Sequence, residues 1–186
     1  MNSSLRKNPV GDQPQVDPSS YVDPTAVIIG PVRIGKNCYI GPTVVVRADE
    51  VNPENGKVAP VIIGDGVNLQ DGVIIHALAG CEVVVGNHCS LAHGSIVHGP
   101  CTVEDGSFVG FGALVFKARV GKGSMVKHGA IVEGVDIPAG KVVPTGSVIT
   151  TIDDLNLLVE INHDNKEFME EVVHTNIGLA SGYKEV

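Results

Sequence analysis

The sequence predicts an all-β protein, a parallel β-helix of about seven turns followed by a C-terminal α-helix. Three observations support this fold class. Aliphatic residues recur at every sixth position over most of the chain, a small residue stands four positions after most of them, and helical spacing begins after residue 150. A six-residue period fits neither an amphipathic helix nor an alternating hairpin, but it is typical of a β-helix built from short strands and corners.

The β-helix is expected to occupy residues 16–150, after an N-terminal extension of residues 1–15. Three six-residue steps make one triangular turn of about eighteen residues. The step is broken by two corner insertions, at residues 51–60 and 77–82, and by two five-residue slips. We expect every stepped position to point inward. These positions are Val16, Val22, Ile28, Ile34, Ile40, Val46, Ile63, Leu69, Ile75, Val85, Leu91, Val97, Val103, Val109, Val115, Val120, Val126, Val132, Ile137, Val143 and Ile149.

Three of the four cysteines occupy the small position that follows an aliphatic step. We therefore interpret Cys38, Cys89 and Cys101 as compact buried hydrophobes. Cys81 lies in the second insertion, and its role is open. The cysteine spacings match neither a disulfide framework nor a zinc finger, so we expect free thiols.

The C-terminal segment, residues 151–186, is predicted to be helical. Thr151 and Asp154 have the spacing of a capping box, in which each side chain accepts a hydrogen bond from the other residue's backbone. Apolar residues then follow at helical intervals, and residues 162–165 are the place where the helix could break. We expect this helix to pack along the coil.

Composition and charge exclude several classes of partner. The chain has 13 Lys and Arg against 21 Asp and Glu, a formal net charge of −8, whereas nucleic acids and anionic membranes select basic surfaces. No apolar run approaches the ~20 residues of a membrane span, and residues 1–15 lack the apolar core of a signal peptide. We therefore expect a cytoplasmic protein that binds neither nucleic acid nor membrane.

A β-helix converts sequence spacing into spatial columns, because equivalent positions on successive turns lie one strand spacing, ~4.8 Å, apart. The residues that follow the third inward position of successive turns are Arg47, His76, His98 and Phe116. They are predicted to form one outward-facing file, termed here the histidine file. Two imidazoles at that separation on rigid strands can point at one cation.

A second file, at a corner of the coil, contains Asp71 and His93, followed by Phe111 and His128. Three His ligands with an open position are the layout of a catalytic zinc site. Because His93 lies off the histidine file, a neighbouring copy around a threefold axis would have to bring it to the His pair. His128 is two turns from His93 and cannot join that site. Spacing alone also allows the alternative that these histidines are solvated or interfacial side chains.

Several segments resemble the gamma-class carbonic anhydrases. They are residues 44–50 (VVVRADE), 68–78 (NLQDGVIIHAL), 90–100 (SLAHGSIVHGP), 108–117 (FVGFGALVFK) and 179–183 (LASGY). The resemblance covers roughly residues 16–186. It implies a left-handed β-helix, a homotrimer and three metal sites at subunit interfaces. It also implies reversible hydration of carbon dioxide to bicarbonate and a proton.

By the same resemblance, His76 and His98 match two metal ligands of one chain, and His93 matches the ligand that a neighbouring chain supplies. Three imidazoles suit zinc, iron or cobalt, and zinc is the expected cofactor. Gln70 matches the residue that holds the metal-bound hydroxide. The remaining matches are Asn68 and Asn176, which place carbon dioxide or bicarbonate, and Arg47, Asp49 and Asp71, which form a charged cluster at the subunit interface.

Proton export is where the sequence departs from the family. Active members carry an acidic loop after the first His ligand, whereas residues 77–84 are a short segment with one carboxylate, Glu82. The candidate proton carriers are Glu50, which directly follows the motif of the charged cluster, then Glu54 and His174, with buffer as the alternative. A family member without efficient export would hydrate carbon dioxide slowly.

Two alternatives come from other functional classes. Hexapeptide acyltransferases share the coil and the trimer but use one catalytic His and a coenzyme A groove, so they would not need His76, His93 and His98 together. A metal-binding or structural trimer of the same family, without significant hydration activity, is the other alternative. Metal analysis tests the first alternative, and a hydration assay tests the second.

Overall fold

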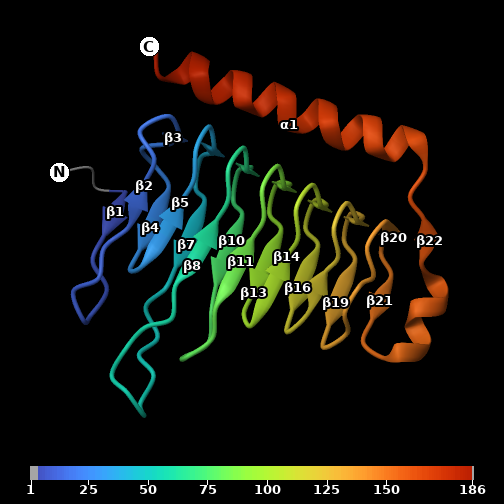
Figure 1. Ribbon diagram of the computed structural model, residues 1–186, viewed down its shortest axis with the longest axis horizontal. Helices are drawn as coiled ribbons and strands as arrows, with labels where there is room; N and C mark the ends of the chain where they lie inside the picture. Colours follow the sequence, from blue (N-terminus) through green and yellow to red (C-terminus); the bar gives the residue numbers. More distant parts are fainter. Residues whose placement is uncertain (1–3, 186) are drawn as a thin grey trace.

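The computed structural model describes residues 4–185 as a triangular coil of three β-sheets with one long helix lying along it (Figure 1). Sheet A contains β1 (Leu5–Arg6), β4 (Val27–Ile29), β7 (Val45–Arg47), β10 (Ile74–His76), β13 (Ile96–His98), β16 (Leu114–Phe116), β19 (Ile131–Glu133) and β21 (Val148–Ile149). Sheet B contains β2 (Gln15–Val16), β5 (Val32–Ile34), β8 (Val61–Ile63), β11 (Val83–Val85), β14 (Cys101–Val103) and β17 (Arg119–Val120). Sheet C contains β3 (Tyr21–Val22), β6 (Tyr39–Ile40), β9 (Asn68–Leu69), β12 (Ser90–Leu91), β15 (Phe108–Val109), β18 (Met125–Val126), β20 (Lys141–Val143) and β22 (Val159–Glu160).

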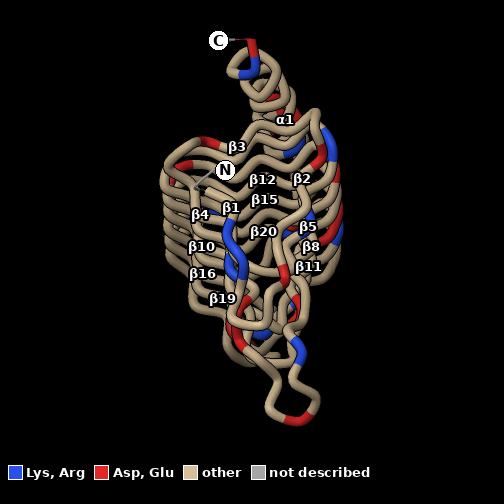
Figure 2. Tube along the Cα trace, turned by 90° about the vertical axis from the view of Figure 1, so that its left-hand side faces the viewer, with Lys and Arg blue, Asp and Glu red and all other residues tan. Residues whose placement is uncertain are grey.

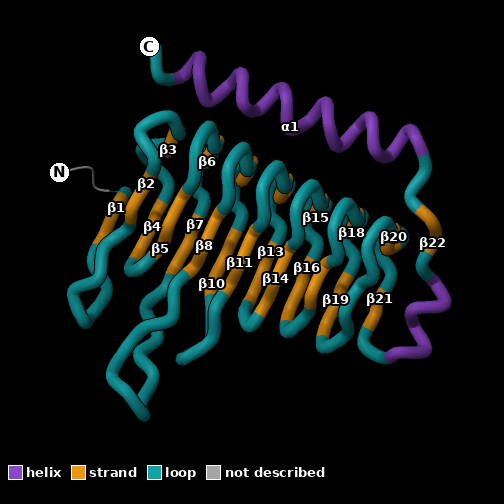
Figure 3. Tube along the Cα trace, in the orientation of Figure 1, coloured by secondary structure: helices purple, strands orange, loops and turns teal. Residues whose placement is uncertain are grey.

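The parallel coil confirms the predicted fold class, with about eight turns where about seven were predicted (Figure 3). The additional turn begins with β1, where Leu5 pairs with Ile28 and packs against the core. The coil therefore includes a strand before Val16, within the segment expected to be an N-terminal extension, of which residues 1–3 lie outside the described residues. The six-residue step does not reveal β1, because the irregular residues 7–14 separate it from β2.

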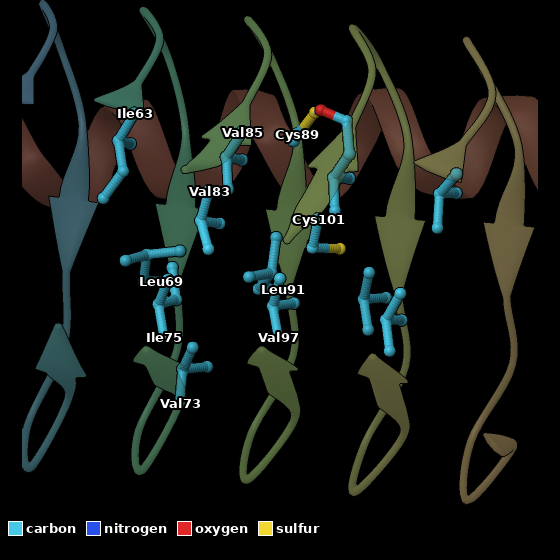
Figure 4. Close-up of a cluster of buried hydrophobic side chains, with 14 of the residues drawn as sticks. Ile63, Leu69, Val73, Ile75, Val83, Val85, Cys89, Leu91, Val97 and Cys101 are labelled. Atoms are coloured by element: carbon cyan, nitrogen blue, oxygen red, sulfur yellow. The ribbon is translucent and has the colours of Figure 1, made fainter. Parts of the chain in front are cut away.

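The inward register agrees with the prediction. The stepped positions from Ile28 to Ile149 are buried, and of the described stepped positions only Val16 and Val22, at the start of sheets B and C, are partly exposed. Figure 4 shows successive layers of these side chains filling the coil between the sheets. The core is therefore almost wholly aliphatic.

The cysteines lie where the repeat predicts. Cys38, Cys89 and Cys101 are buried free thiols, which confirms their interpretation as core residues. Figure 4 shows Cys89 and Cys101 among the core side chains. Burial raises the pKa of Cys89 and of Cys101 to about 12, so neither thiol ionises near neutral pH. Cys81 is a partly exposed free thiol in the second insertion.

The corners between the sheets differ in what they carry. The corner from sheet C to sheet A is a two-residue turn in every described turn of the coil, whereas the corner from sheet A to sheet B holds both insertions. The insertion at residues 51–60 projects beyond the coil and has an acidic tip (Figure 2). The insertions follow β7 and β10, which carry the histidine file, so they border that file.

The C-terminal segment departs from the prediction. The capping box at Thr151 is present, but it opens a short 3-10 helix, η1 (Ile152–Leu157), and β22 then pairs antiparallel with β20. The long helix α1 (His163–Tyr183) begins only after this strand. Leu155 and Leu158 pack against the core, so this segment covers the open end of the coil before the chain turns back. One continuous helix from Thr151 could not do this.

Helix α1 covers the outer face of sheet C (Figures 1 and 2). Met169 of α1 joins Phe108 of β15 in a second, smaller apolar cluster. At the other end of the helix the ring of Tyr183 stacks on Tyr21, with centroids 5.0 Å apart. Among residues 4–185, no helix combines the length and the apolar character needed to cross a membrane.

Candidate metal centre

The histidine file lies on the outer face of sheet A. Arg47, His76 and His98 occupy matched positions on β7, β10 and β13, and Phe116 follows on β16, as the repeat predicts. The imidazole rings of His76 and His98 meet edge to face, with centroids 5.0 Å apart and planes at 89°. Neighbouring parallel strands therefore hold the two rings side by side.

The two rings present nitrogen atoms to one point, because His76 Nδ1 and His98 Nε2 are 3.2 Å apart. Two nitrogen ligands at about 2.0–2.1 Å from a tetrahedral zinc ion lie roughly 3.3–3.4 Å from each other, so this spacing suits a shared ion. His98 Nδ1 lies 3.2 Å from the carbonyl oxygen of Gly99. A hydrogen bond donated from Nδ1 to that oxygen leaves the lone pair of His98 on Nε2. The donor set therefore fits a metal.

Charged residues lie on the other side of His76. Its Nε2 atom is 3.2 Å from Asp49 Oδ1 and 3.3 Å from Arg47 Nη2, and Arg47 and Asp49 are an ion pair at 3.5 Å. If the Asp49 carboxylate accepts the hydrogen of Nε2, the lone pair of His76 lies on Nδ1, the atom that faces His98. Asp49 can thus orient His76 as Gly99 orients His98.

Glu50 lies beside the same ring and is held by a backbone hydrogen bond. Its Oε1 atom is 3.6 Å from His76 Nε2, and its Oε2 atom accepts a hydrogen bond of 2.9 Å from the backbone N–H of Ala79. The insertion at residues 77–82 therefore positions a carboxylate that belongs to the preceding turn. Glu54 is exposed in the neighbouring insertion.

His93 lies at the corner from sheet C to sheet A, away from the His pair. It precedes β13, whereas His98 ends that strand. The His93 side chain is 52% exposed, and its Nδ1 atom is 3.7 Å from Asp71 Oδ2. Within residues 4–185, no three metal-ligating side chains are arranged to hold an ion. As predicted, His93 does not join the His pair within one chain.

Comparison with known proteins assigns these residues to a family. Residues 11–48 match the family described as Bacterial transferase hexapeptide (six repeats). The carbonic anhydrase of Methanosarcina thermophila is 38% identical, in an alignment that covers 98% of this chain and 82% of that protein. The chain belongs to the hexapeptide-repeat family of the gamma-class carbonic anhydrases.

Other similar proteins have different names. A carboxysome assembly protein, CcmM of Nostoc sp., is 38% identical over 91% of this chain, but the chain spans only 31% of that protein. The solved structure of a hexapeptide transferase family protein from Anaplasma phagocytophilum has a TM-score of 0.82 and 26% identity, covering 98% of this chain and 99% of that one. Membership of the gamma-class family therefore does not by itself establish activity.

Three polar residues that the gamma-class resemblance selects lie on β9 and α1. Asn68 is 1% exposed, and its Nδ2 donates a hydrogen bond of 2.7 Å to Ser90 Oγ, while its Oδ1 accepts none from the described residues. Asn176 is 5% exposed and donates to the carbonyl oxygen of Val172 at 2.8 Å. Both are covered in a single chain, because α1 packs on sheet C. Gln70 is half-buried just after β9, before the corner.

His174 lies on a different side of α1 from Asn176, since positions two residues apart on a helix are about 200° apart around its axis. It is exposed and lines a cavity of about 540 Å³ together with His88, Gly106 and Gly123. These residues belong to the corner from sheet B to sheet C, at the opposite edge of sheet C from His93. Within one chain, His174 is therefore not close to the histidine file.

A partly exposed aliphatic file on sheet A of this gamma-class family member was not predicted from the sequence. It runs beside the histidine file, and its member next to His76, Ile74, is 40% exposed. The signal is present in the sequence, because an aliphatic residue directly precedes the third inward position of each of the seven turns from Ile28 to Ile149. Ile74, Ile131 and Val148 are exposed and the other members are partly exposed, and aliphatic residues gathered on one face in this way are typical of an interaction surface. The members, which are in register, are Val27, Val45, Ile74, Ile96, Leu114, Ile131 and Val148.

Proposed function

We propose that the protein is a metal-dependent carbonic anhydrase, which hydrates carbon dioxide reversibly to bicarbonate and a proton. The observation that carries this proposal is the 3.2 Å approach of His76 Nδ1 to His98 Nε2, in a chain that aligns over 98% of its length with a carbonic anhydrase. Zinc is the expected ion, and a set of three imidazoles also suits iron or cobalt.

We propose a homotrimer with one site at each interface. His93 lies in the corner turn before β13 and His98 ends that strand, so the His pair of one chain needs a corner of another chain to complete it. The aliphatic file lies between that corner and the histidine file, and a partner subunit that covered it would bury apolar surface. Each site would then contain His76 and His98 of one chain and His93 of the next.

A bound ion would supply a water of lowered pKa, and thus a nucleophile near neutral pH, for which carbonic anhydrase is itself the standard example. If Asp49 and the Gly99 carbonyl accept the hydrogens of His76 Nε2 and His98 Nδ1, the lone pairs of His76 Nδ1 and His98 Nε2 stay available to an ion. Gln70 precedes the corner turn that stacks on the His93 turn, as the hydrogen bond from Gly94 N to Asp71 O shows. We therefore assign Gln70 the orientation of the nucleophile, from the subunit that supplies His93.

Asn68 and Asn176 are the proposed residues for placing carbon dioxide or bicarbonate. This assignment is supported by the resemblance of their motifs, and both side chains are covered by the packing of α1 on sheet C in a single chain. Carbon dioxide or bicarbonate would therefore have to reach these two side chains at the edge of α1.

Glu50 is the group that we propose carries the proton away. One carboxylate oxygen lies 3.6 Å from the His76 ring, and the Ala79 N–H holds the other. Glu54, exposed in the insertion that follows Glu50, is the next carrier toward solvent. His174 is the weaker alternative, because it lies at another corner of the coil.

Metal analysis combined with a carbon dioxide hydration assay tests the proposed activity. Protein loaded with zinc, iron or cobalt should bind about one ion per chain and accelerate hydration, and His76→Ala should lose both properties. Metal binding without hydration would favour a metal-binding or structural trimer, a role that the similarity to a carboxysome assembly protein supports. Absence of metal binding would contradict the metal centre and favour the acyltransferase alternative.

A mixing experiment tests whether the site is shared between chains. In homotrimers, His93→Ala and His76→Ala each remove one ligand from every site. In mixed trimers, some interfaces combine the intact His pair of the His93→Ala chain with the intact His93 of the His76→Ala chain. Metal binding should then return in part. Mixed trimers that recover no metal would show that the site is not shared.

A further inference from the structure

His93 is the least constrained of the three proposed ligands. It lies in a corner turn, its side chain is 52% exposed, and the Asp71 carboxylate is 3.7 Å away. A metal ligand binds well only when neighbouring groups fix the orientation of its ring, and a loosely held ligand loses affinity. Some other contact must therefore hold this imidazole.

Two aromatic rings from the following turns continue a stack that begins at His93, with Phe111 against His93 and His128 against Phe111. The Phe111 ring lies against the His93 ring with centroids 5.6 Å apart and planes at 25°, and His128 lies against Phe111 at 4.4 Å and 10°. Backbone hydrogen bonds keep these turns in register, from Gly112 N to His93 O at 3.0 Å and from Gly129 N to Phe111 O at 2.8 Å. The rings of His93, Phe111 and His128 are termed here the aromatic ladder.

The far end of the aromatic ladder is anchored to the backbone. The N–H of Phe111 donates a hydrogen bond of 3.1 Å to Nδ1 of His128. This bond fixes the orientation of the His128 ring, and Phe111 is held between that ring and His93. Phe111 is 46% exposed and is not among the residues of either apolar core cluster. Its ring contacts are instead those with the two histidines.

We propose that Phe111 and His128 are positioning residues, which hold the His93 imidazole in the orientation that reaches the metal at the partner's His pair. The proposal rests on the proposed function. It gives a role to two residues that bind neither metal nor substrate.

Metal affinity of the intact trimer tests the role of Phe111. By competition with a chelator, Phe111→Ala should bind zinc roughly tenfold or more weakly, as when other supporting partners of a ligand are removed. Phe111→Tyr keeps the flat ring and should restore the affinity. The matched control is Phe168→Ala, which removes a similarly exposed phenylalanine whose ring meets Phe108 edge to face and should leave the affinity unchanged.

The visible spectrum of the cobalt-loaded trimer gives a second readout, because it reports the geometry of the ligands. Phe111→Ala should change that spectrum, and Phe168→Ala should not. His128→Ala should act in the same direction as Phe111→Ala but less strongly. In the double variant, the loss in free energy of zinc binding should be smaller than the sum of the two single losses, since both substitutions act on one stack.

Mixed trimers separate positioning from a general effect on stability. In mixtures of His76→Ala and His93→Ala chains, the working His93 comes from the His76→Ala chain. Adding Phe111→Ala to that chain should remove most of the recovered metal binding. Adding Phe111→Ala to the His93→Ala chain, which has no His93 to position, should reduce the recovered metal binding much less.

The proposal would be overturned if Phe111→Ala reduced the recovered metal binding equally on either chain, or if the Phe111→Ala trimer bound zinc as tightly as the wild type. Either result would leave the metal centre intact. A wild-type trimer that binds no metal would instead overturn the proposed function, and this proposal with it.

Discussion

Gln70 lies half-buried just after β9, next to Asp71, the residue one turn of the coil before His93. From this position it can orient a nucleophile without binding the ion. Gln70→Ala should therefore retain metal but lose hydration rate, by roughly tenfold to a hundredfold, since misplacement of reacting groups costs rate on that scale. Metal content and kcat measured on one sample check this expectation. An equal loss of metal would make Gln70 a structural support.

Glu50 lies within reach of the metal centre and of the solvent-exposed insertions. Glu50→Ala should lower kcat while leaving kcat/KM nearly intact, because proton export follows the chemical step. Small imidazole buffers should restore the rate, and His174→Ala should have a weaker effect. The measurement is kcat as a function of buffer concentration. If kcat at low buffer is unchanged in both variants, neither residue carries the proton.

The residues of the histidine file could be identified by counting, because a fixed repeat makes His76 and His98 neighbours whatever the rest of the chain does. The contacts that orient them could not. The hydrogen bond from Ala79 to Glu50 depends on how one insertion folds against the other, and the six-residue repeat does not extend into the insertions. The aromatic ladder was visible as a file, but only the structure shows that its rings stack face to face.

At the level of elements, the repeat predicts the middle of the coil better than its ends. Each inner strand has a neighbour on both sides, so its inward residue must match the layers above and below. The end turns have one neighbour, and terminal units of repeat proteins must also cover the exposed core. This explains why β1 lies off the six-residue step, and why η1 and β22 interrupt the predicted helix.

The cover at the end of the coil depends on Asp154. Its carboxylate accepts hydrogen bonds from Thr150 N at 2.9 Å and from Thr151 N and Oγ1 at 2.8 and 2.9 Å. These bonds, the one from Thr150 N foremost, lower the pKa of Asp154 below its usual 3.8. A carboxyl group with a lowered pKa in the folded state stabilises the protein above its unfolded pKa, and this contribution is lost as the pH falls through the folded value.

Asp154→Asn should therefore lower the melting temperature at neutral pH, because the amide lacks the charge that strengthens these bonds. The difference from the wild type should shrink as the pH falls below 3.8. Thermal unfolding of both proteins over a pH series measures it. A difference that persists at low pH would show that the cap does not act through its charge.

At the scale of the whole molecule, the chain carries a complete core, whereas the proposed metal site is divided between subunits. The sequence predicts both files, but a single chain contains no contact that says which surface of a second copy meets His93. In the proposed trimer the aliphatic file marks the surface that meets the neighbouring subunit, because it lies on sheet A between the His93 corner and the histidine file. Assembly and metal binding are thus expected to depend on the same face.

A charge placed on that face should separate the subunits. Ile74→Asp introduces a carboxylate beside His76, at a position that is 40% exposed in the single chain and buried in the proposed interface. Desolvating an unpaired charge is costly, so we expect monomers that remain folded and bind no metal. Analytical ultracentrifugation measures the oligomeric state, circular dichroism the folding, and metal analysis the bound ion.

Leu179→Asp, a matched change at an exposed leucine of α1, should leave the trimer intact. If Ile74→Asp stays trimeric and keeps its metal, the subunits meet through another face, and the shared site must be assigned elsewhere.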